Sequence, residues 1–233
     1  SEMHNNVYLL KDAATGEALL VDAADDGDGM RLRSLLEDLH PADVDAEMIA
    51  ASAITYLEGY LWDPPHAKEA FRKAAKIAHE AGRQVALTLS DAFCVDRYRA
   101  EFLELIKAGT VDLVFANERE LISLYQTADF DTAAKALRGD AKLAVVTRSE
   151  KGCVVISKSD MVSVPAAPIR KMVDATGAGD LFAAGFLVGL SRGRDHKTAG
   201  QLGAIAAAEV IQHIGARPEV SLKELAQQSG LKL

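Results

Sequence analysis

The chain has 233 residues, of which 49% are hydrophobic and 26% are charged, and its net charge is −8. This composition is ordinary for a globular protein, and the negative balance argues against nucleic acid or an anionic membrane as a partner. The two cysteines, Cys94 and Cys153, form no paired motif, and the first residues lack a secretory pattern. Both features favour a cytoplasmic location.

The first 40 residues differ in pattern from the rest of the chain. The elements expected there are a β-hairpin over 7–10 and 18–22, an acidic solvated turn over 22–28 and a helix over 30–40. We therefore expect two parts, a hairpin and helix segment over 1–40 and a main domain over 41–233.

From about residue 41 onward, strand-like and helix-like patterns alternate. The expected strands are 54–57, 85–89, 111–116 and 143–147, with a hairpin over 154–157 and 161–164. The expected helices are 63–82, 95–107, one from Asn117, one from the 174–180 turn to about 190, 198–213 and one from Leu222. Such alternation predicts an α/β fold with an open, mostly parallel sheet and helices on both faces. Ligands bind at the carboxyl ends of the strands in this fold.

The most informative segment is the small-residue turn Asp174-Ala175-Thr176-Gly177-Ala178-Gly179-Asp180. It leads directly into an apolar helical pattern, so the N–H groups of Gly177, Ala178 and Gly179 would lie at a helix N-terminus and could hold an anion. Asp180 would lie in the first turn, close enough to accept a proton from a hydroxyl. An anion site and a carboxylate base on one turn are what phosphoryl transfer to an alcohol requires.

Other interpretations of this turn are a plain capped helix start or a different nucleotide-binding motif. Phe182 stands where a dinucleotide fingerprint has its third glycine, and the chain contains no Gly-Lys-Ser or Gly-Lys-Thr sequence. These two motifs are therefore excluded, while the capped turn stays open as the structural alternative.

Three further positions follow predicted strands or end a helix. Asn117 and Glu120 have the spacing of a capping box at a helix start, which is the structural alternative to a ligand site. Thr147 and Gly152 enclose a turn after the strand 143–147. His213 ends an Ala-rich helix, where a lone histidine commonly pairs with the helix dipole.

Together these motifs resemble those of the pfkB (ribokinase-like) carbohydrate and nucleoside kinases, in the family's chain order. The commoner family form has Thr where this chain has Ala175. The resemblance implies ATP and Mg²⁺ as cofactors, with a monovalent cation such as K⁺. It implies Asp180 as general base with Gly177, Ala178 and Gly179 as the anion hole, and assigns nucleotide binding to Asn117, Glu120, Thr147, Gly152, Asp174, Thr176 and His213. Asn117 and Glu120 would position Mg²⁺ through water.

The resemblance runs from about residue 41 to 230. The first 40 residues lack the family's substrate Asp, its Gly-Gly…Asn motif and its N-terminal substrate lid. Two hypotheses follow: a kinase for the hydroxyl of an adenosine-like nucleoside or a sugar such as ribose or fructose, or a truncated or fused nucleotide-binding remnant without catalysis. A sheet without its first strands would expose an edge, which favours a homodimer. The segments 56–65 and 89–93 resemble those of bacterial adenosine and sugar kinases of the family, and their aromatic residues are assigned to the core by default.

Overall fold

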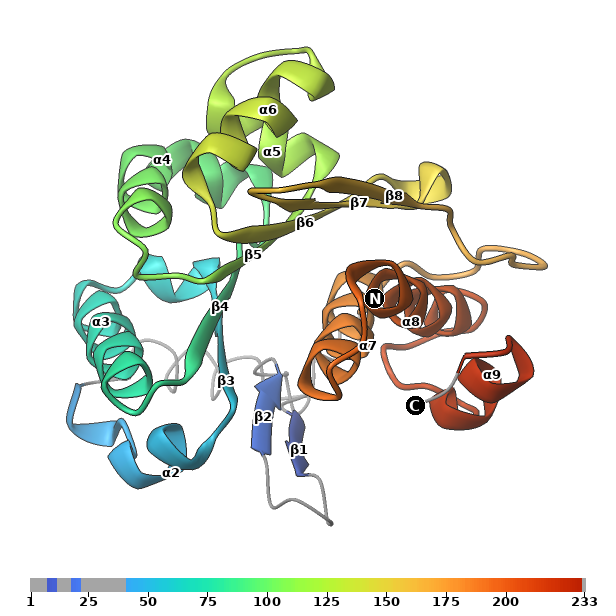
Figure 1. Cartoon of the computed structure of the whole chain (residues 1–233), viewed down its shortest axis with the longest axis horizontal. Coiled ribbons are helices and arrows are strands. Elements are labelled where there is room, and N and C mark those ends of the chain that lie inside the picture. The colour runs from blue at the N-terminus through green and yellow to red at the C-terminus, as the bar shows by residue number, and fades with distance from the viewer. Residues whose placement is uncertain (1–7, 12–17, 22–40, 232–233) are drawn as a thin grey trace. The chain divides into compact units, whose positions relative to one another are not determined.

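The computed structural model describes residues 8–11, 18–21 and 41–231 (Figure 1). The expected N-terminal hairpin is confirmed, because β1 (Tyr8–Lys11) pairs antiparallel with β2 (Ala18–Val21). The acidic turn over 22–28 and the helix over 30–40 lie outside the described residues.

Six further strands form one open sheet whose spatial order follows the chain order. They are β3 (Ile54–Glu58), β4 (Gln84–Thr88), β5 (Leu113–Asn117), β6 (Leu143–Thr147), β7 (Cys153–Ser157) and β8 (Met161–Val164). β3 pairs parallel with β4, and β4 with β5. β7 and β8 are joined by residues 158–160 alone, which is too short for a parallel crossover, so the sheet is mixed. The predicted α/β class with an open, mostly parallel sheet is confirmed.

Each helix predicted within 41–233 has a counterpart among the described helices. These are α2 (Ala46–Ala51), α3 (Pro65–Glu80), α4 (Ala92–Lys107), α5 (Glu118–Tyr125), α6 (Phe130–Asp140), α7 (Ala178–Ser191), α8 (His196–Val210) and α9 (Leu222–Gln228), with short 3-10 helices η1 (Pro41–Asp43), η2 (Gly59–Trp62) and η3 (Ser149–Lys151). Of these, α2 and α6 are additional to the predicted helices. None of these described helices is both long and apolar enough to cross a bilayer.

Two differences from the predicted helices have a local cause. α4 begins three residues earlier than expected, because the Asp91 carboxylate accepts a hydrogen bond of 2.6 Å from the Cys94 N–H and caps the helix. α6 was not predicted, since only Phe130 and Leu137 are large among its buried residues and the apolar period is weak. Asp129 caps α6 through the Thr132 N–H at 2.9 Å.

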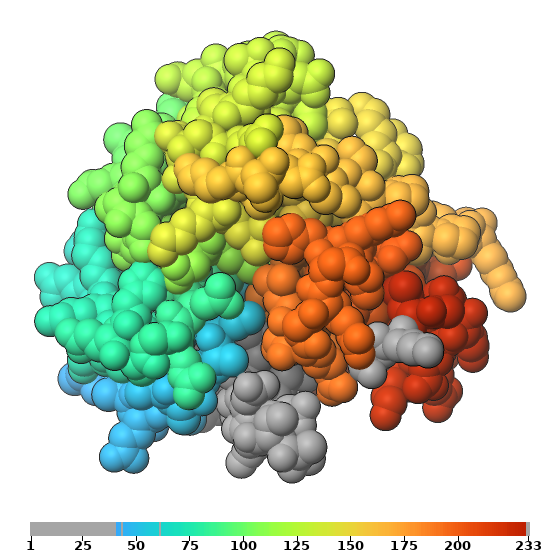
Figure 2. Space-filling model, in the orientation of Figure 1, coloured from blue at the N-terminus to red at the C-terminus, as the bar shows by residue number. Residues whose placement is uncertain are grey.

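The chain divides into two compact units, Ser1–Val145 with Ile156–Ser159, and Val146–Val155 with Asp160–Leu233. In the first unit, α3 buries one continuous face made of Ala67, Ala70, Phe71, Ala74, Ala75 and Ala78. The fully buried Trp62 packs edge-on against Phe71 at 4.8 Å between ring centroids. Figure 2 shows α3 against the blue segment that contains η1 and α2.

In the second unit, α7 and α8 lie side by side at very short range (Figure 1). A side chain on Gly185 would begin 2.6 Å from the Leu202 carbonyl oxygen, and one on Gly203 would begin 2.7 Å from that of Phe182. Glycine at these positions therefore lets the two backbones approach. The turn that leads into α7 and the loop that follows α8 are both attached to this closely packed pair of helices.

The first unit is held at the amino ends of its strands by the buried carboxylate of Asp112. Its Oδ2 accepts from His79 Nε2 at 2.7 Å and from the Val85 N–H at 2.9 Å, and its Oδ1 accepts from Lys142 Nζ at 2.6 Å. Burial alone would raise the pKa of Asp112, but the hydrogen bonds from Lys142, His79 and Val85 lower it. One carboxylate thus connects α3, β4 and the segments that precede β5 and β6.

We expect Asp112→Asn to lower the free energy of unfolding by about 2 kcal/mol at pH 7. The three donors around this position would then face a neutral amide in place of a negative charge. The folded pKa of Asp112 lies below its unfolded value, so its stabilisation is complete above that value and is lost as pH falls. Urea denaturation of both proteins from pH 7 to 3 measures this, and the curves should converge in acid. Asp131→Asn, at an exposed site on α6, is the control. An unchanged gap at every pH would contradict the assignment.

Candidate active site

The turn that precedes α7 is organised by the carboxylate of Asp174. Its Oδ1 accepts from the Thr176 N–H at 2.9 Å and from the Thr176 hydroxyl at 2.7 Å, while its Oδ2 accepts from the Gly215 N–H at 3.0 Å. The hydrogen bond from the Thr176 hydroxyl, followed by those from the Gly215 and Thr176 N–H groups, lowers the pKa of Asp174 to about 2. Asp174 is therefore ionised at any physiological pH and holds Thr176 in place.

Gly177 is the N-cap of α7 and has a φ of 75°. This left-handed conformation is one that other residues adopt at a cost. A side chain on Gly177 would also begin 2.6 Å from the Cβ of Ala216. The turn therefore requires glycine for two independent reasons, its backbone angle and its contact with the loop after α8.

The first turn of α7 carries the groups predicted for catalysis. The Ala178 N–H donates to the Ala175 carbonyl at 3.2 Å, so it serves the turn itself in this structure. Apart from its chain neighbours and the backbone of its own helix, no described atom lies within 4 Å of the place where a Gly179 side chain would begin. Asp180 is half-buried, and burial raises the pKa of its carboxyl. A raised pKa makes this carboxylate a stronger base than an ordinary surface aspartate.

His213 lies just beyond the end of α8 and is mostly buried. Its Nε2 is 3.2 Å from Oε1 of Glu209, and its Nδ1 is 3.8 Å from Oε1 of Glu219. Burial lowers the pKa of His213, but the hydrogen bond and charge of Glu209 outweigh burial and raise it. Within the described residues, His213 therefore lies near two carboxylates, in addition to its position at the end of a helix.

The turn between β6 and β7 contains the predicted residues Thr147 and Gly152. Thr147 is the last residue of β6, and Arg148 N–H donates to the Gly152 carbonyl at 2.7 Å to close the turn. A side chain on Gly152 would begin 2.0 Å from the Val164 carbonyl oxygen. Packing against β8 is therefore sufficient to explain glycine at this position, and nucleotide binding by Thr147 and Gly152 stays a prediction.

In the first unit, Asn117 and Glu120 form the capping box that the sequence allowed. The Asn117 side chain accepts from the Glu120 N–H at 2.9 Å, and Glu120 Oε2 accepts from the Asn117 N–H at 2.9 Å. Oε1 of Glu120 accepts from the Asn117 amide at 2.5 Å. Glu120 is only 4% exposed, and burial together with the charge of Asp91 raises its pKa to about 7, although the Asn117 N–H opposes this.

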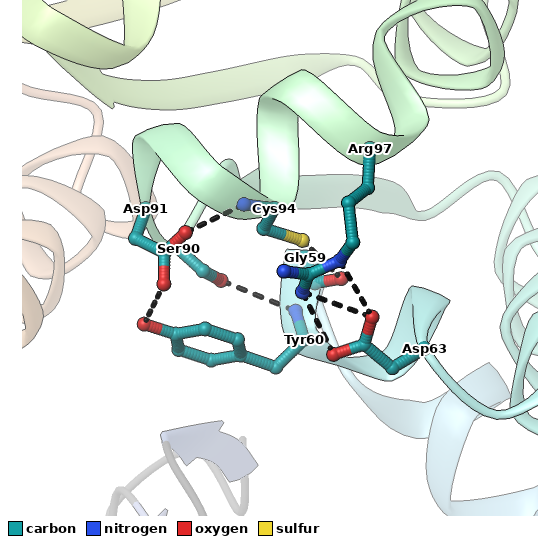
Figure 3. A network of polar contacts seen from close by, with 7 residues as sticks. All are labelled: Gly59, Tyr60, Asp63, Ser90, Asp91, Cys94 and Arg97. Carbon is teal, nitrogen blue, oxygen red and sulfur yellow. Dashed lines mark hydrogen bonds and ion pairs between the residues drawn. The ribbon is translucent and has the colours of Figure 1, made fainter.

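Sequence reasoning missed the polar network beside this carboxylate, at the carboxyl ends of β3 and β4 (Figure 3). Tyr60 donates its hydroxyl proton to Asp91 at 3.0 Å, and its N–H donates to the Ser90 hydroxyl at 3.3 Å. The Cys94 thiol contacts the Gly59 carbonyl at 3.2 Å. The only available signal was the position of Ser90 and Asp91 directly after a predicted strand.

The assignment of the neighbouring aromatics to the core is right for Tyr56 and Trp62 and wrong for Tyr60 and Phe93. Tyr60 is 44% exposed and Phe93 is 76% exposed. Phe93 lies in the first turn of α4, where Cys94 and Val95 take the buried positions. Both rings therefore belong to the surface at the strand ends.

The sheet and its helices have the ribokinase-like fold. A putative ribokinase II from E. coli superposes with a TM-score of 0.74 over 96% of this chain and 70% of that chain, at 18% identity. The family model described as pfkB family carbohydrate kinase matches residues 4–222, so the chain belongs to that family. The match begins within the segment 1–40 that the sequence pattern set apart, and a boundary at residue 40 stays a prediction.

Two solved structures are similar in sequence as well as in fold. A probable sugar kinase from Rhizobium etli is 54% identical with a TM-score of 0.83, covering 84% of this chain and 59% of that chain. The adenosine kinase of Sinorhizobium meliloti is 54% identical with a TM-score of 0.81, covering 83% of this chain and 59% of that chain. The chain therefore spans less than two thirds of the length of these relatives.

We expect Gly177→Ala to destabilise the protein by about 2–4 kcal/mol, because it adds overpacking against Ala216 to the strain of a positive φ. Gly193→Ala is the matched control, since Gly193 has a φ of 66° but open space around it. That variant should lose only about 1–2 kcal/mol. Urea denaturation measures both, and equal losses would show that the Ala216 contact is unimportant.

Glu120→Gln tests the buried carboxyl of the first unit. Because its folded pKa of about 7 lies above the unfolded value of 4.5, stability is greatest below the latter and falls as pH rises through about 7. Glutamine is uncharged and its single amide oxygen can still accept from the Asn117 N–H, so we expect the variant to be more stable at pH 8 by up to about 3 kcal/mol. Denaturation in metal-free buffer at pH 4.5 and 8 measures this. Glu104→Gln, at an exposed site, is the control, and a gain equal at both pH values would refute the assignment.

Proposed function

We propose that the chain carries the site of an ATP-dependent kinase that phosphorylates a hydroxyl group, with Asp180 as the general base. The observation that carries the proposal is the half-buried Asp180, whose pKa is raised, in the first turn of a helix that begins with a glycine turn. A base with a raised pKa accepts a hydroxyl proton more effectively, and a helix start favours negative charge nearby. Membership of the pfkB family supports the same reaction.

The residues around the turn fit a bound nucleotide. Gly179 leaves its surroundings open, and the helix start provides a positive dipole end for phosphate oxygens. When bound, Mg·ATP supplies the phosphoryl group and the metal's neutralisation of phosphate charge. Asp174 and Thr176 hold the turn, while Gly177 and Gly179 present backbone N–H groups to the transferred group.

We propose that Asn117 and Glu120 position Mg²⁺ through water, and the Glu120 carboxylate has oxygen atoms that suit this role. Both Glu120 oxygens accept hydrogen bonds from Asn117, yet each carboxylate oxygen retains a further lone pair for a water molecule. In the second unit, Thr147, Gly152 and His213 are the further residues that we propose for nucleotide binding. A monovalent cation such as K⁺, a cytoplasmic location and a homodimer belong to the same proposal.

A nucleoside similar to adenosine is the favoured acceptor, with ribose- or fructose-like sugars second. The likeness to the Sinorhizobium meliloti adenosine kinase supports this order, and the likeness to a probable sugar kinase supports the second class. Tyr60 and Phe93 expose aromatic rings at the carboxyl ends of β3 and β4, where a planar base could stack. A free sugar offers no such planar face.

The alternative is a nucleotide-binding remnant without catalysis. The glycine turn at the start of α7 suits phosphate oxygens whether or not a hydroxyl proton is then transferred, so nucleotide binding alone is the second candidate function.

Turnover of Mg·ATP with adenosine, ribose and fructose tests the proposal. We expect Asp180→Asn to lower turnover by about a thousandfold while ATP affinity changes little, because the amide has the same size but cannot accept the proton. Asp195→Asn is the control, since asparagine retains the cap of α8. Wild-type turnover in Asp180→Asn would contradict the proposed base. Thermal stabilisation by Mg·ATP without any turnover would favour the remnant.

A further inference from the structure

The loop after α8 is the direct support of the turn that begins α7. The Gly215 N–H donates to Asp174 at 3.0 Å, and Ala216 occupies the space beside Gly177. The segment before the turn is attached to the same region, because the N–H of Val173 donates to the Ile211 carbonyl at 2.8 Å. A displacement of this loop would therefore displace the turn.

One buried carboxylate closes this loop at both ends. Glu209, in the last turn of α8, is only 8% exposed. Its Oε1 lies 3.2 Å from His213 Nε2 at the start of the loop and accepts from the Glu219 N–H at 2.9 Å at the end. Residues 213–219 are thus held as a ring around a single oxygen atom.

The burial of Glu209 is costly and is not fully compensated. Its second oxygen, Oε2, is buried without a hydrogen-bond partner among the described residues. A buried carboxylate oxygen without a partner loses its hydration, and an apolar residue of similar size would avoid that cost. Both hydrogen-bond contacts of Oε1 are with the ends of the loop, so the carboxylate acts on the loop.

We propose that Glu209 is a positioning residue that fixes the turn 174–180 through the loop 213–219. The contacts run from Glu209 to His213 and Glu219, then from Gly215 and Ala216 to the turn. The mechanical part of the proposal, that Glu209 holds the turn through the loop, depends on these contacts alone. Its relevance to catalysis rests on the proposed function. Of the two residues that contact Glu209 Oε1, His213 also belongs to the proposed nucleotide site, and Glu219 lies at the far end of the loop.

Amide hydrogen exchange of the full chain tests the mechanical part. We expect Glu209→Ala to speed exchange of the N–H groups in 174–179 by about tenfold or more, because both ends of the supporting loop are released. Glu209→Gln should have a smaller effect, since its amide oxygen can still accept from the Glu219 N–H but offers no charge to His213. Exchange in 183–190, farther along α7, should stay at the wild-type rate.

Asp112→Asn is the matched control. Asp112 is also a buried carboxylate paired with a histidine, at 2.7 Å from His79, but it belongs to the first unit and takes no part in the loop. This variant should leave exchange in 174–179 unchanged. Equal acceleration in Asp112→Asn, or equal acceleration along all of α7 in Glu209→Ala, would overturn the proposal by showing only general destabilisation. Unchanged exchange in Glu209→Ala would overturn it directly.

Calorimetric titration with Mg·ATP separates this proposal from the proposed function. We expect Glu209→Ala to bind ATP about five- to tenfold more weakly than wild type, and Asp112→Asn to bind it as wild type does. ATP binding by wild type with unchanged exchange in Glu209→Ala would support the function and overturn the positioning role. Accelerated exchange in 174–179 without ATP binding by wild type would support the mechanical coupling and count against the kinase.

Discussion

The hydrogen bonds to the Asp174 carboxylate are the interaction on which the site of the second unit depends. The chain between β8 and α7 buries little apolar surface, and Ile169, Met172 and Val173 are exposed. Hydrophobic packing therefore cannot determine its path, and the polar contacts to Thr176 and Gly215 do so instead. Because Asp174 is ionised, these hydrogen bonds are charge-assisted and stronger than neutral ones.

Carboxylates have different roles at the amino and carboxyl ends of the strands of the first unit. Asp112 is surrounded by donors, and its lowered pKa reflects a charge that stabilises the fold. Glu120 is buried, accepts hydrogen bonds from Asn117 and lies near the charge of Asp91, so its raised pKa reflects a charge that destabilises the fold. A destabilising buried charge at the carboxyl ends of strands is typical of a functional site rather than of a structural one.

The sequence was sufficient for elements whose pattern is local. α3 buries the apolar residues that its spacing predicted, and β6 has the predicted bounds, because alternation and helical spacing directly reflect which face is buried. α6 is not predicted because it buries only Phe130, Leu137 and two alanines, which give a weak periodic signal in the sequence. The core assignment fails for Tyr60 and Phe93 because tertiary packing decides which side of η2 and of the first turn of α4 faces the core.

By itself, the sequence determined the α/β class, the helix start at 177–180 and the resemblance to the pfkB kinases, since these depend on residue order over short stretches. Only the tertiary structure decided which groups hold the turn. Gly215 and Ala216 lie about forty residues after Asp174 and Gly177 in the chain, and Glu209 acts on them from the end of α8. Contacts of this kind leave no periodic pattern, because they depend on how α7 and α8 pack rather than on neighbours in sequence.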